Sequence, residues 1–365
     1  MNPMQRTPAE VAGALKSWLA DLPADWPPAD AATHAFCRQR LAQVADAAVL
    51  GAKLAGDLGE RPWRPLGHVL AVISENDHLG VVAALVAAAL TGNRLTLKSR
   101  SGLAVLQRLR DALGWDASMC RIDDWTSSTQ DDAQLLGGVD GVLVAGGEAL
   151  IRHYRQAAAP GVRLIEYGPQ ISAAQVLAWP ASPAEQSLCI EALVRDTTLF
   201  LQNVCSSPQV IIVPDEEVAD SLFAALSERL EVSPDWPVLP DEVRLQQSVE
   251  TQELRLRARL GEPIAVAMAA KSGWAVTRTP LAVIDHLPRG FRLVVADATS
   301  VAAALPSLQT LGVWLPPRAD GASSGLLPAL HVCRLGCMHE RSLSAPHDGH
   351  WELAQWVRFV SCDLP

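Results

Sequence analysis

Short apolar runs alternate with helix-like stretches along the first half of the chain, and this alternation most limits what the chain can fold into. The expected strands cover residues 67–74, 94–98, 141–146 and 162–168, and the expected helices cover 80–90, 103–113 and 148–158. Strands separated by helices at this interval favour a doubly wound α/β layer with a mostly parallel sheet. In such sheets, ligands bind beyond the carboxyl ends of the strands.

The composition is that of a globular protein with a large core. The chain has 365 residues, of which 49% are hydrophobic, and this length favours two domains. The net charge is −10 and no stretch gathers many Lys or Arg residues, which argues against nucleic-acid binding. The longest apolar run, at 79–90, is shorter than the about 20 residues that span a bilayer, so it predicts a buried helix. The N-terminus lacks a signal-peptide pattern, and the expected location is the cytoplasm.

The second half of the chain is expected to form a separate region. A proline-containing stretch at 179–185 leads into it, and it begins with a helix at 184–195. An acidic helix at 216–230 and a strand-rich stretch at 265–295 follow, and turn residues predict a surface loop at 316–325. Near the C-terminus Asp348 is a good N-cap, and the apolar spacing after it predicts a final helix docked on the body. The residues with that spacing are Leu353, Trp356, Val357 and Val360.

Cys205 stands out in the segment LFLQNVCSSPQVIIV, between an apolar run and a β-branched run. Residues 210–213 predict a buried strand. Pro208 has no N–H to donate, so it belongs at the first residues of that strand or at a sheet edge. Cys205 is therefore expected in the turn that leads into the strand. From these residues alone, an inert core thiol and a nucleophile at a pocket are both open.

The other cysteines do not predict a disulfide framework or a metal site. Their total of seven is odd, and they are scattered along a chain without a secretion signal. One cluster within HVCRLGCMH contains His331, Cys333, Cys337 and His339. On a strand these side chains would be spread too far along one face to surround one ion, and their spacing matches no standard zinc pattern.

Three polar features follow expected strands at their carboxyl ends. Asn76 follows the strand at 67–74, so its amide is expected over that edge of the sheet, although Asn is also a common helix cap. Lys98 ends the strand at 94–98 and is either a donor to a ribose or phosphate or a solvated lysine. Gly146 and Gly147 open a helix in the layout that admits a pyrophosphate, or they form an ordinary turn. No G-x-G-x-x-G motif and no P-loop is present.

The order of these motifs resembles the aldehyde dehydrogenase superfamily and, within it, the LuxC-type acyl-CoA reductases. The resemblance runs from about Gly67 to Val213 and reappears near the C-terminus. It rests on ISENDHL, TGNRLTLKS, VAGGEALIRHY, IEYGPQIS, LQNVCSSPQVIIV and RLGCMHERSLSAPHDGHWELAQWVRFV. The chain is shorter than a usual superfamily member, which implies a reduced N-terminal arm and oligomerisation hairpin.

The resemblance implies a role for each motif. Cys205 would be the nucleophile, Asn76 would hold the oxyanion, and Lys98 would bind the cofactor ribose. Gly146, Gly147 and Gly168 would lie beside the nicotinamide cofactor. Glu166 aligns with the glutamate that activates water in oxidising relatives, and in a reductase it would turn away or take part in proton transfer. Ser99 and Arg100 follow Lys98 where relatives that use NAD often carry an acidic residue, which favours NADPH over NADH.

The implied fold is aldehyde-dehydrogenase-like, with two doubly wound α/β domains and the active site in the cleft between them. The cofactor domain would cover residues 1–183 and regain residues 326–365, and the catalytic domain would cover residues 184–325. The implied reaction is NADPH-dependent reduction of an acyl thioester, on CoA or a carrier protein and with a fatty acyl chain, to the aldehyde through a Cys205 acyl-enzyme.

Two other functions remain open on the sequence alone. One is an aldehyde dehydrogenase or acyl-thioester hydrolase in which Glu166 activates water. The other is a non-catalytic acyl-binding or scaffold protein that keeps the fold. The sequence also leaves open a homo-oligomer and a partner enzyme that activates or transfers the acyl group.

Overall fold

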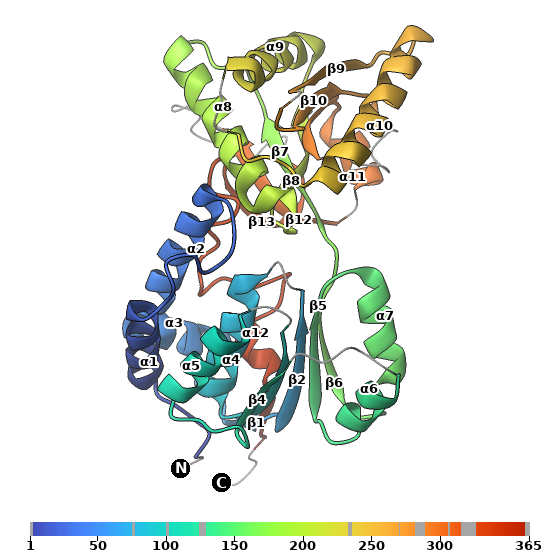
Figure 1. The fold of residues 1–365 in the computed structure, drawn as a ribbon. Helices are drawn as coiled ribbons and strands as arrows, with labels where there is room; N and C mark the ends of the chain where they lie inside the picture. Colours follow the sequence, from blue (N-terminus) through green and yellow to red (C-terminus); the bar gives the residue numbers. More distant parts are fainter. Residues whose placement is uncertain are drawn as a thin grey trace. The chain divides into compact units, whose positions relative to one another are not determined.

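The chain forms two compact units in the computed structural model. The structure describes residues 3–74, 77–99, 102–123, 129–232, 236–269, 271–281, 289–305, 307–314 and 326–361. The first unit contains residues 1–169 and 342–365, and the second contains residues 170–341. The chain thus leaves the first unit once and returns to it near the C-terminus (Figure 1).

The first unit begins with three N-terminal helices, and strands alternating with helices follow them in the sequence. Its strands are β1 (Trp63–Pro65), β2 (His68–Ile73), β3 (Arg94–Lys98), β4 (Cys120–Asp123), β5 (Gly141–Ala145), β6 (Arg163–Tyr167) and β14 (Val357–Phe359). Its helices are α1 (Pro8–Ala20), α2 (Ala31–Val44), α3 (Ala47–Leu58), α4 (His78–Thr91), α5 (Leu103–Ala112), α6 (Thr129–Leu136), α7 (Glu148–Ala157) and α12 (Glu352–Gln355). The expected strand over 94–98 is confirmed at both ends, and the other strands and helices expected between residues 67 and 168 match within a few residues.

A five-stranded parallel sheet, in the order β4-β3-β2-β5-β6, forms the centre of this unit. One face packs on α4, α5 and the N-terminal helices, and the other packs on α6 and α7 (Figure 1). The apolar run at 79–90 is the buried helix α4, because ten of its side chains are shielded from solvent. None of the helices in the described part of the chain combines the length and apolar character needed to cross a bilayer.

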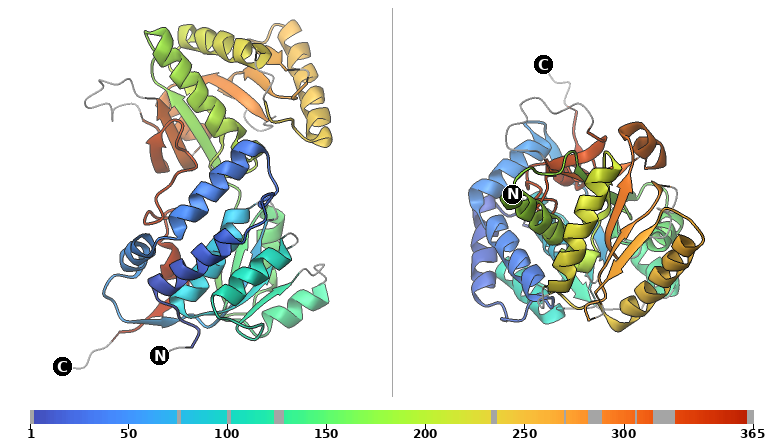
Figure 2. Two further views of the ribbon diagram at one scale, coloured as in Figure 1. Left: turned by 60° about the vertical axis from the view of Figure 1, so that its left-hand side comes forward. Right: turned by 90° about the horizontal axis from the view of Figure 1, so that it is seen from above.

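The second unit carries a larger sheet. Its strands are β7 (Ile171–Val176), β8 (Pro208–Val213), β9 (Ala265–Met268), β10 (Ala275–Arg278), β11 (Gly290–Val295), β12 (Leu308–Trp314) and β13 (Ala329–Arg334). Its helices are α8 (Pro183–Thr198), the 3₁₀ turn η1 (Leu199–Gln202), α9 (Glu216–Val232), α10 (Asp241–Arg259) and α11 (Ala298–Ala304). Figure 2 shows these helices, in yellow-green to orange, packed around the strands of this unit.

The seven strands of this sheet run in the order β13-β12-β7-β8-β11-β10-β9. Each neighbouring pair is parallel except β9 and β10, which are antiparallel. The prediction for Pro208 is confirmed, since it is the first residue of β8, where a missing N–H costs the ladder least. The first unit therefore has the doubly wound α/β character that the alternating pattern predicts, and the second has the α/β character that the family resemblance implies.

The boundaries between the two units differ from the expected ones. Residues 170–183 lie in the second unit and not in the first, because β7 pairs with both β8 and β12. Residues 326–341 also lie in the second unit, because β13 pairs with β12. The return of the chain to the first unit starts at Ser342.

The predicted final helix is wrong in length and in its N-cap. Helix α12 has four residues with Trp351 at its N-cap, and Asp348 has a positive φ of 49°. The chain then forms β14, which pairs antiparallel with β1. Leu353, Trp356 and Val357 are buried as the apolar pattern predicts, but one short turn and a strand bury them. Backbone pairing with β1, about 300 residues earlier in the chain, replaces helical hydrogen bonds.

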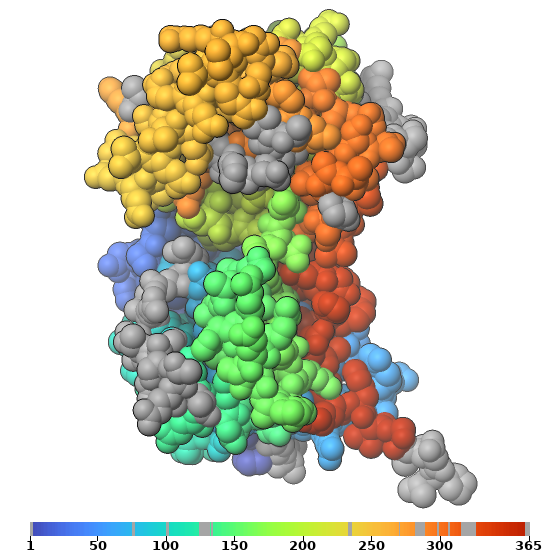
Figure 3. Space-filling view, turned by 90° about the vertical axis from the view of Figure 1, so that its right-hand side faces the viewer, coloured from blue at the N-terminus to red at the C-terminus, as the bar shows by residue number. Residues whose placement is uncertain are grey.

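A buried ion cluster attaches the C-terminal segment to α3. The Lys53 ammonium lies 3.2 Å from the Asp57 carboxylate, 2.9 Å from the Glu352 carboxylate and 3.1 Å from the Leu343 carbonyl oxygen. Asp57 also accepts a hydrogen bond from the Leu353 N–H at 2.8 Å. Figure 3 shows this C-terminal segment in red on the surface of the first unit. The returning chain is therefore held by polar contacts as well as by its apolar side chains.

Replacing Lys53 should destabilise the protein strongly. Lys53→Met leaves two carboxylates next to each other without their cation, and losing one partner of a buried pair costs about 3–5 kcal/mol. We expect urea denaturation to show a loss of this size in the free energy of unfolding. The matched control is Lys16→Met, because Lys16 is exposed on α1. Equal stabilities of the two variants would contradict the assignment.

Candidate active site

The residues expected to bind a cofactor gather at the carboxyl edge of the five-stranded sheet. Lys98 is the last residue of β3, Gly146 and Gly147 join β5 to α7, and Gly168 directly follows β6. Parallel pairing places the ends of β3, β5 and β6 on the same side of the sheet. Asn76 and Arg100 fall outside the described residues. Cys205 lies in the second unit.

Lys98 is buried. Its exposed fraction is 6%, and that of the following Ser99 is also 6%. The alternative of a solvated lysine is therefore wrong. Asp123, on the neighbouring strand β4, pairs in register with Lys98. This residue was not predicted from the sequence. Arg121 donates a hydrogen bond to the Asp123 carboxylate, so that this acidic group at the edge is already paired.

The two glycines after β5 differ in what they do. Gly146 donates its N–H to the Tyr167 carbonyl at 3.1 Å and so extends the pairing of β5 with β6. Gly147 is the N-cap of α7, with φ −67° and ψ 160°, which any residue can adopt. A Cβ added to Gly147 would meet no heavy atom within 4 Å. The backbone does not need glycine at 147, and there is open space in front of the helix N-terminus, where an anion would be favoured.

Glu166 is bound by an arginine. On α7, Arg155 donates through Nε to Oε1 at 2.9 Å and through Nη2 to Oε2 at 2.6 Å. This hydrogen bond raises the pKa of Arg155. Both carboxylate oxygens of Glu166 therefore accept from one guanidinium, a paired geometry that fixes orientation. A carboxylate held in this way is poorly placed to take a proton from water.

Cys205 follows an unusual turn in the second unit. Phe200, Leu201 and Gln202 have positive φ values of 58°, 51° and 57°. Each such residue costs on the order of 1–2 kcal/mol unless it is glycine. The prediction that Cys205 lies in the turn before the strand is confirmed, since β8 starts at Pro208. Strained backbone of this kind often occurs at functional sites, where surrounding contacts maintain it.

The side chain of Gln202 clasps the main chain of Gly290 and so holds this turn. Its Oε1 accepts from the Gly290 N–H at 2.7 Å, and its Nε2 donates to the Gly290 carbonyl at 3.1 Å and to the Pro208 carbonyl at 2.6 Å. Arg289 adds a donor to the Leu201 carbonyl at 2.8 Å. Gly290 must be glycine because it has φ +142° and an added Cβ would lie 2.3 Å from the Ala275 carbonyl oxygen.

Two buried side chains contact Cys205 itself. The Ser172 hydroxyl donates to the Cys205 carbonyl at 2.6 Å, and Gln309 donates from Nε2 to the Cys205 Sγ at 3.0 Å. Their exposed fractions are 0% and 5%, while Cys205 is half-buried. The main chain and the sulfur of Cys205 are thus both fixed by polar contacts.

The histidine that follows β13 contacts the residue next to Cys205. His339 Nε2 donates to the Asp196 carbonyl at 2.9 Å, so Nδ1 accepts from the Ser206 hydroxyl at 2.8 Å. Burial lowers the pKa of His339 to about 4, which keeps the ring neutral at pH 7. Of the four residues weighed for zinc, His331 and Cys333 lie on β13, and Cys337 and His339 lie beyond its end. No cluster of three or more His, Cys, Asp and Glu side chains fit for a metal ion occurs in the described ranges.

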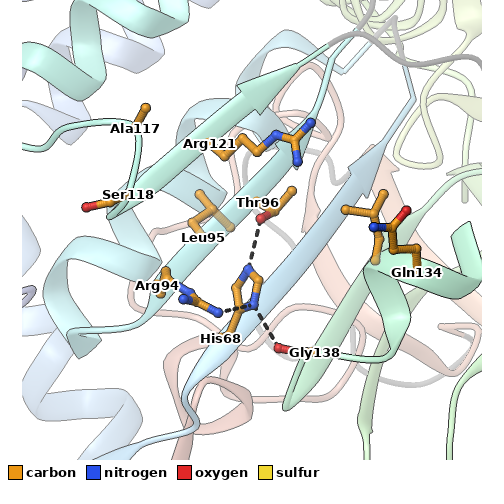
Figure 4. Close-up of a pocket in the computed structure, with 10 residues that line it drawn as sticks. His68, Arg94, Leu95, Thr96, Ala117, Ser118, Arg121, Gln134 and Gly138 are labelled. Carbon is orange, nitrogen blue, oxygen red and sulfur yellow. Dashed lines mark hydrogen bonds between the residues drawn. The ribbon is translucent and has the colours of Figure 1, made fainter. Parts of the chain in front are cut away.

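A cavity of about 620 Å³ lies elsewhere in the first unit (Figure 4). It opens at the amino ends of β2 and β3, where His68 contacts Arg94, Thr96 and the Gly138 carbonyl. The residues expected to do chemistry are not among those that line it. Arg121, one of its two guanidiniums, is paired with Asp123. We therefore do not assign this cavity to the active site.

Sequence reasoning missed Ser172, Gln202, Gln309 and Arg155. Ser172 and Gln309 are polar residues within apolar strands, and Gln202 directly follows three apolar residues, which was the available signal. Arg155 has no such signal, because an arginine on the polar face of a helix is ordinary.

The sequence matches a known protein family. The profile of the family described as acyl-CoA reductase (LuxC) matches residues 54–359. A search of curated proteins finds no match.

Comparison with solved structures shows the fold. A proline utilization A structure with proline bound in remote sites superposes with TM-score 0.69 and 17% identity, over 97% of this chain. This chain spans only 42% of that protein. A lactaldehyde dehydrogenase has TM-score 0.68 and 13% identity, covering 96% of this chain and 84% of its own. A NAD-dependent benzaldehyde dehydrogenase from Corynebacterium glutamicum has TM-score 0.64 and 14% identity, with coverages of 97% and 84%. The fold is aldehyde-dehydrogenase-like.

Removing the clasp on the turn should destabilise the protein. Gln202→Ala deletes three hydrogen bonds and leaves the Gly290 N–H and carbonyl without these partners, which should cost about 2 kcal/mol or more. Chemical denaturation measures the difference. Gln246→Ala on the exposed face of α10 is the control, and we expect it to change stability by at most about 0.5 kcal/mol. A Gln202→Ala protein as stable as this control would show that other contacts hold the turn.

Proposed function

The chain belongs to the LuxC family of acyl-CoA reductases, and from this premise we propose that it reduces an acyl thioester to an aldehyde through an acyl-enzyme on Cys205. The observation that carries the proposal is the setting of Cys205. The thiol is half-buried and follows a strained turn, the carbonyl of Cys205 is fixed by Ser172, and a buried amide donates to the sulfur. A structural core cysteine needs none of these contacts.

The reaction proceeds in two stages at this sulfur. The Cys205 thiolate attacks the thioester carbonyl, and the departing thiol leaves an acyl group on Sγ. The Cys205 N–H would hold the developing oxyanion and, as the family resemblance implies, so would the Asn76 amide, a kind of contact worth about 3 kcal/mol per donor. After reduction of the acyl carbon, the thiohemiacetal collapses and releases the aldehyde from Cys205. The thioester stage matters because a free carboxylate resists hydride.

The carboxyl edge of the five-stranded sheet suits a nicotinamide cofactor. Lys98 would bind the ribose and Gly147, at the start of α7, would face the pyrophosphate, with Gly146 and Gly168 shaping the edge. The open space in front of Gly147 fits this role. When bound, the nicotinamide supplies the hydride. The protein contributes the buried cation, the helix N-terminus and the position of the acyl group.

We propose NADPH as the preferred cofactor. Ser99 and Arg100 follow Lys98, and a cation with hydroxyls suits a 2′-phosphate. Asp123, in register with Lys98, argues instead for NADH, because a carboxylate suits the free ribose hydroxyl of that cofactor. The Asp123 carboxylate is already paired with Arg121, which weakens this argument for NADH. NADH is therefore the second arm of each cofactor experiment.

Glu166 is not expected to activate water in this protein. Arg155 binds both of its carboxylate oxygens within the same unit. A reductase must protect its acyl-enzyme from hydrolysis, and a neutralised carboxylate serves that need. This contact supports reduction over the aldehyde dehydrogenase or hydrolase alternative.

The substrate proposal covers fatty acyl thioesters on CoA or on a carrier protein, in the cytoplasm. A partner enzyme that activates or transfers the acyl group would supply the thioester. Chain length and donor are variables of the experiment that follows.

Acylation of Cys205 should be visible without any cofactor. Intact-protein mass spectrometry after brief mixing with a long-chain acyl-CoA should show one added acyl mass on the wild type and none on Cys205→Ala. Adding NADPH should remove the adduct and release aldehyde, while NADH should do so more slowly.

Two outcomes would contradict this mechanism. If no adduct forms with any acyl-CoA or acyl carrier protein, the acyl-enzyme proposal fails. If the adduct forms but decays to the free acid before cofactor is added, the hydrolase alternative is favoured and Glu166 is active.

Filling the space at Gly147 should separate cofactor binding from acylation. Gly147→Val should weaken NADPH binding at least about tenfold, because the side chain blocks charge-assisted contacts to phosphate that are worth about 1.5–3 kcal/mol. Fluorescence titration of NADPH measures this affinity. Acylation by acyl-CoA in the same variant is the internal control and should keep its wild-type yield. If the NADPH affinity of this variant is unchanged, the pyrophosphate does not bind in front of Gly147.

A further inference from the structure

Irregular pairing around Ser172 brings Gln309 to Cys205. Along β12, Leu308 pairs with Ile171 but Leu311 pairs with Ala173, so residues 309 and 310 together face Ser172. On the other side, Ser172 pairs with Pro208 while Ala173 pairs with Val210, which leaves Gln209 as an extra residue. Extra residues of this kind locally break the ladder and redirect side chains, and they are frequent next to active sites.

The freed backbone groups are satisfied by side chains of the same cluster. The Ser172 N–H donates to Gln209 Oε1 at 2.8 Å, and the Thr310 N–H donates to the Ser172 hydroxyl oxygen at 3.1 Å. The same hydroxyl donates to the Cys205 carbonyl. Ser172 thus joins β12 to the cysteine turn, and Gln309 is held next to the sulfur by the strand that carries it.

The orientation of the Gln309 amide matters chemically. Its Nε2 lies 3.0 Å from Cys205 Sγ, and its Oε1 lies 3.5 Å from the Thr310 hydroxyl. An N–H group can only donate, and a donor favours an acceptor that carries negative charge. The other polar position of this buried strand, Thr310, contacts the far end of the amide. The arrangement presents a buried donor to the sulfur of the proposed nucleophile.

We propose that Gln309 is a positioning residue that stabilises the thiolate form of Cys205. The inference rests on the proposed function, since it concerns the same sulfur. Before acylation, the amide N–H favours the deprotonated, nucleophilic form of the thiol. In the last step the carbon–sulfur bond of the thiohemiacetal breaks, the carbonyl double bond of the aldehyde forms, and the hydroxyl proton passes to solvent. The electron pair of the broken bond returns to Cys205 Sγ, and the same N–H donates a hydrogen bond to the thiolate that forms.

The test is the pH dependence of Cys205 alkylation, which requires neither substrate nor cofactor. Iodoacetamide reacts with the thiolate, so the rate at which the Cys205 peptide gains the label follows deprotonation. We expect Gln309→Leu to move the midpoint of this profile upward by about one to two pH units, since a hydrogen bond to a charged group is lost. Peptide mass spectrometry separates the label on Cys205 from label on the other cysteines.

A second variant and a control keep the result interpretable. Gln309→Glu has the same shape but places a carboxylate beside the sulfur, so its midpoint should rise at least as far as that of Gln309→Leu. This variant also serves if Gln309→Leu does not fold. Gln175→Leu removes another buried glutamine, on β7, whose Oε1 accepts from the Leu327 N–H. It should leave the alkylation midpoint of Cys205 unchanged.

Acylation provides a readout that a merely structural role would not move. At pH 7 the rate of acyl-enzyme formation in Gln309→Leu should fall about ten- to a hundredfold, and it should recover when the pH is raised above the new midpoint. An unchanged alkylation midpoint in both Gln309 variants overturns the inference. So does a loss of acylation that high pH does not restore.

The failure of this inference can be told apart from the failure of the proposed function. If Cys205→Ala still reduces acyl-CoA, the acyl-enzyme proposal falls, and the alkylation profiles still report on Gln309. If Cys205→Ala is inactive and the Gln309 variants alkylate like wild type, the nucleophile stands and only the role of Gln309 is lost.

Discussion

The irregular strand pairing on both sides of Ser172 is the constraint on which the cysteine site depends. A regular parallel sheet would satisfy its own backbone groups and direct Gln309 by simple alternation. Here β8 and β12 each gain extra residues opposite Ser172. The Ser172 hydroxyl consequently reaches the Cys205 carbonyl, and the Gln309 amide reaches its sulfur. The break in regular pairing at Ser172 therefore allows two side chains to fix Cys205.

The turn before Cys205 shows how the fold maintains a costly conformation. Three consecutive residues other than glycine have positive φ. The Gln202 side chain binds the main chain of Gly290 and Pro208, and Arg289 donates to the Leu201 carbonyl, so these contacts hold the turn in place. Strain of this kind persists only where neighbouring contacts over-determine it. Because Gln202 binds both backbone groups of Gly290, the position of the thiol depends on the start of β11 as well as on its own strand.

The contact between Arg155 and Glu166 bears on the direction of the chemistry. The aldehyde-dehydrogenase-like fold is shared by proteins with very different sequences, so the fold alone does not specify reduction or oxidation. In this chain a carboxylate at the end of β6 is bound on both oxygens by a guanidinium of α7. Under the proposed function, an acyl-enzyme must be protected from water, and we expect this pair of residues in a single unit to keep Glu166 from activating it.

The sequence by itself determined the local elements and the class of fold. Alternating apolar runs predicted strands β2, β3, β5 and β6 and helices α4, α5 and α7 of the first unit, and the missing N–H of Pro208 predicted its place at the start of β8. The position of Cys205 in a turn, of Lys98 at a strand end and of two glycines before α7 also followed from local pattern. These features depend on residues that are neighbours in the chain, where periodicity and turn chemistry act.

Only the tertiary structure decided the contacts between distant segments. The C-terminal apolar spacing fitted a helix, yet pairing with β1 made most of it a turn and a strand. Gln309 and Cys205 are 104 residues apart, and their contact depends on a break in register that no local pattern encodes. The burial of Lys98 and the pairing of Glu166 with Arg155 likewise depend on neighbouring elements. A residue's chemistry follows from its sequence, but its partners are selected by the register and packing of the folded sheets.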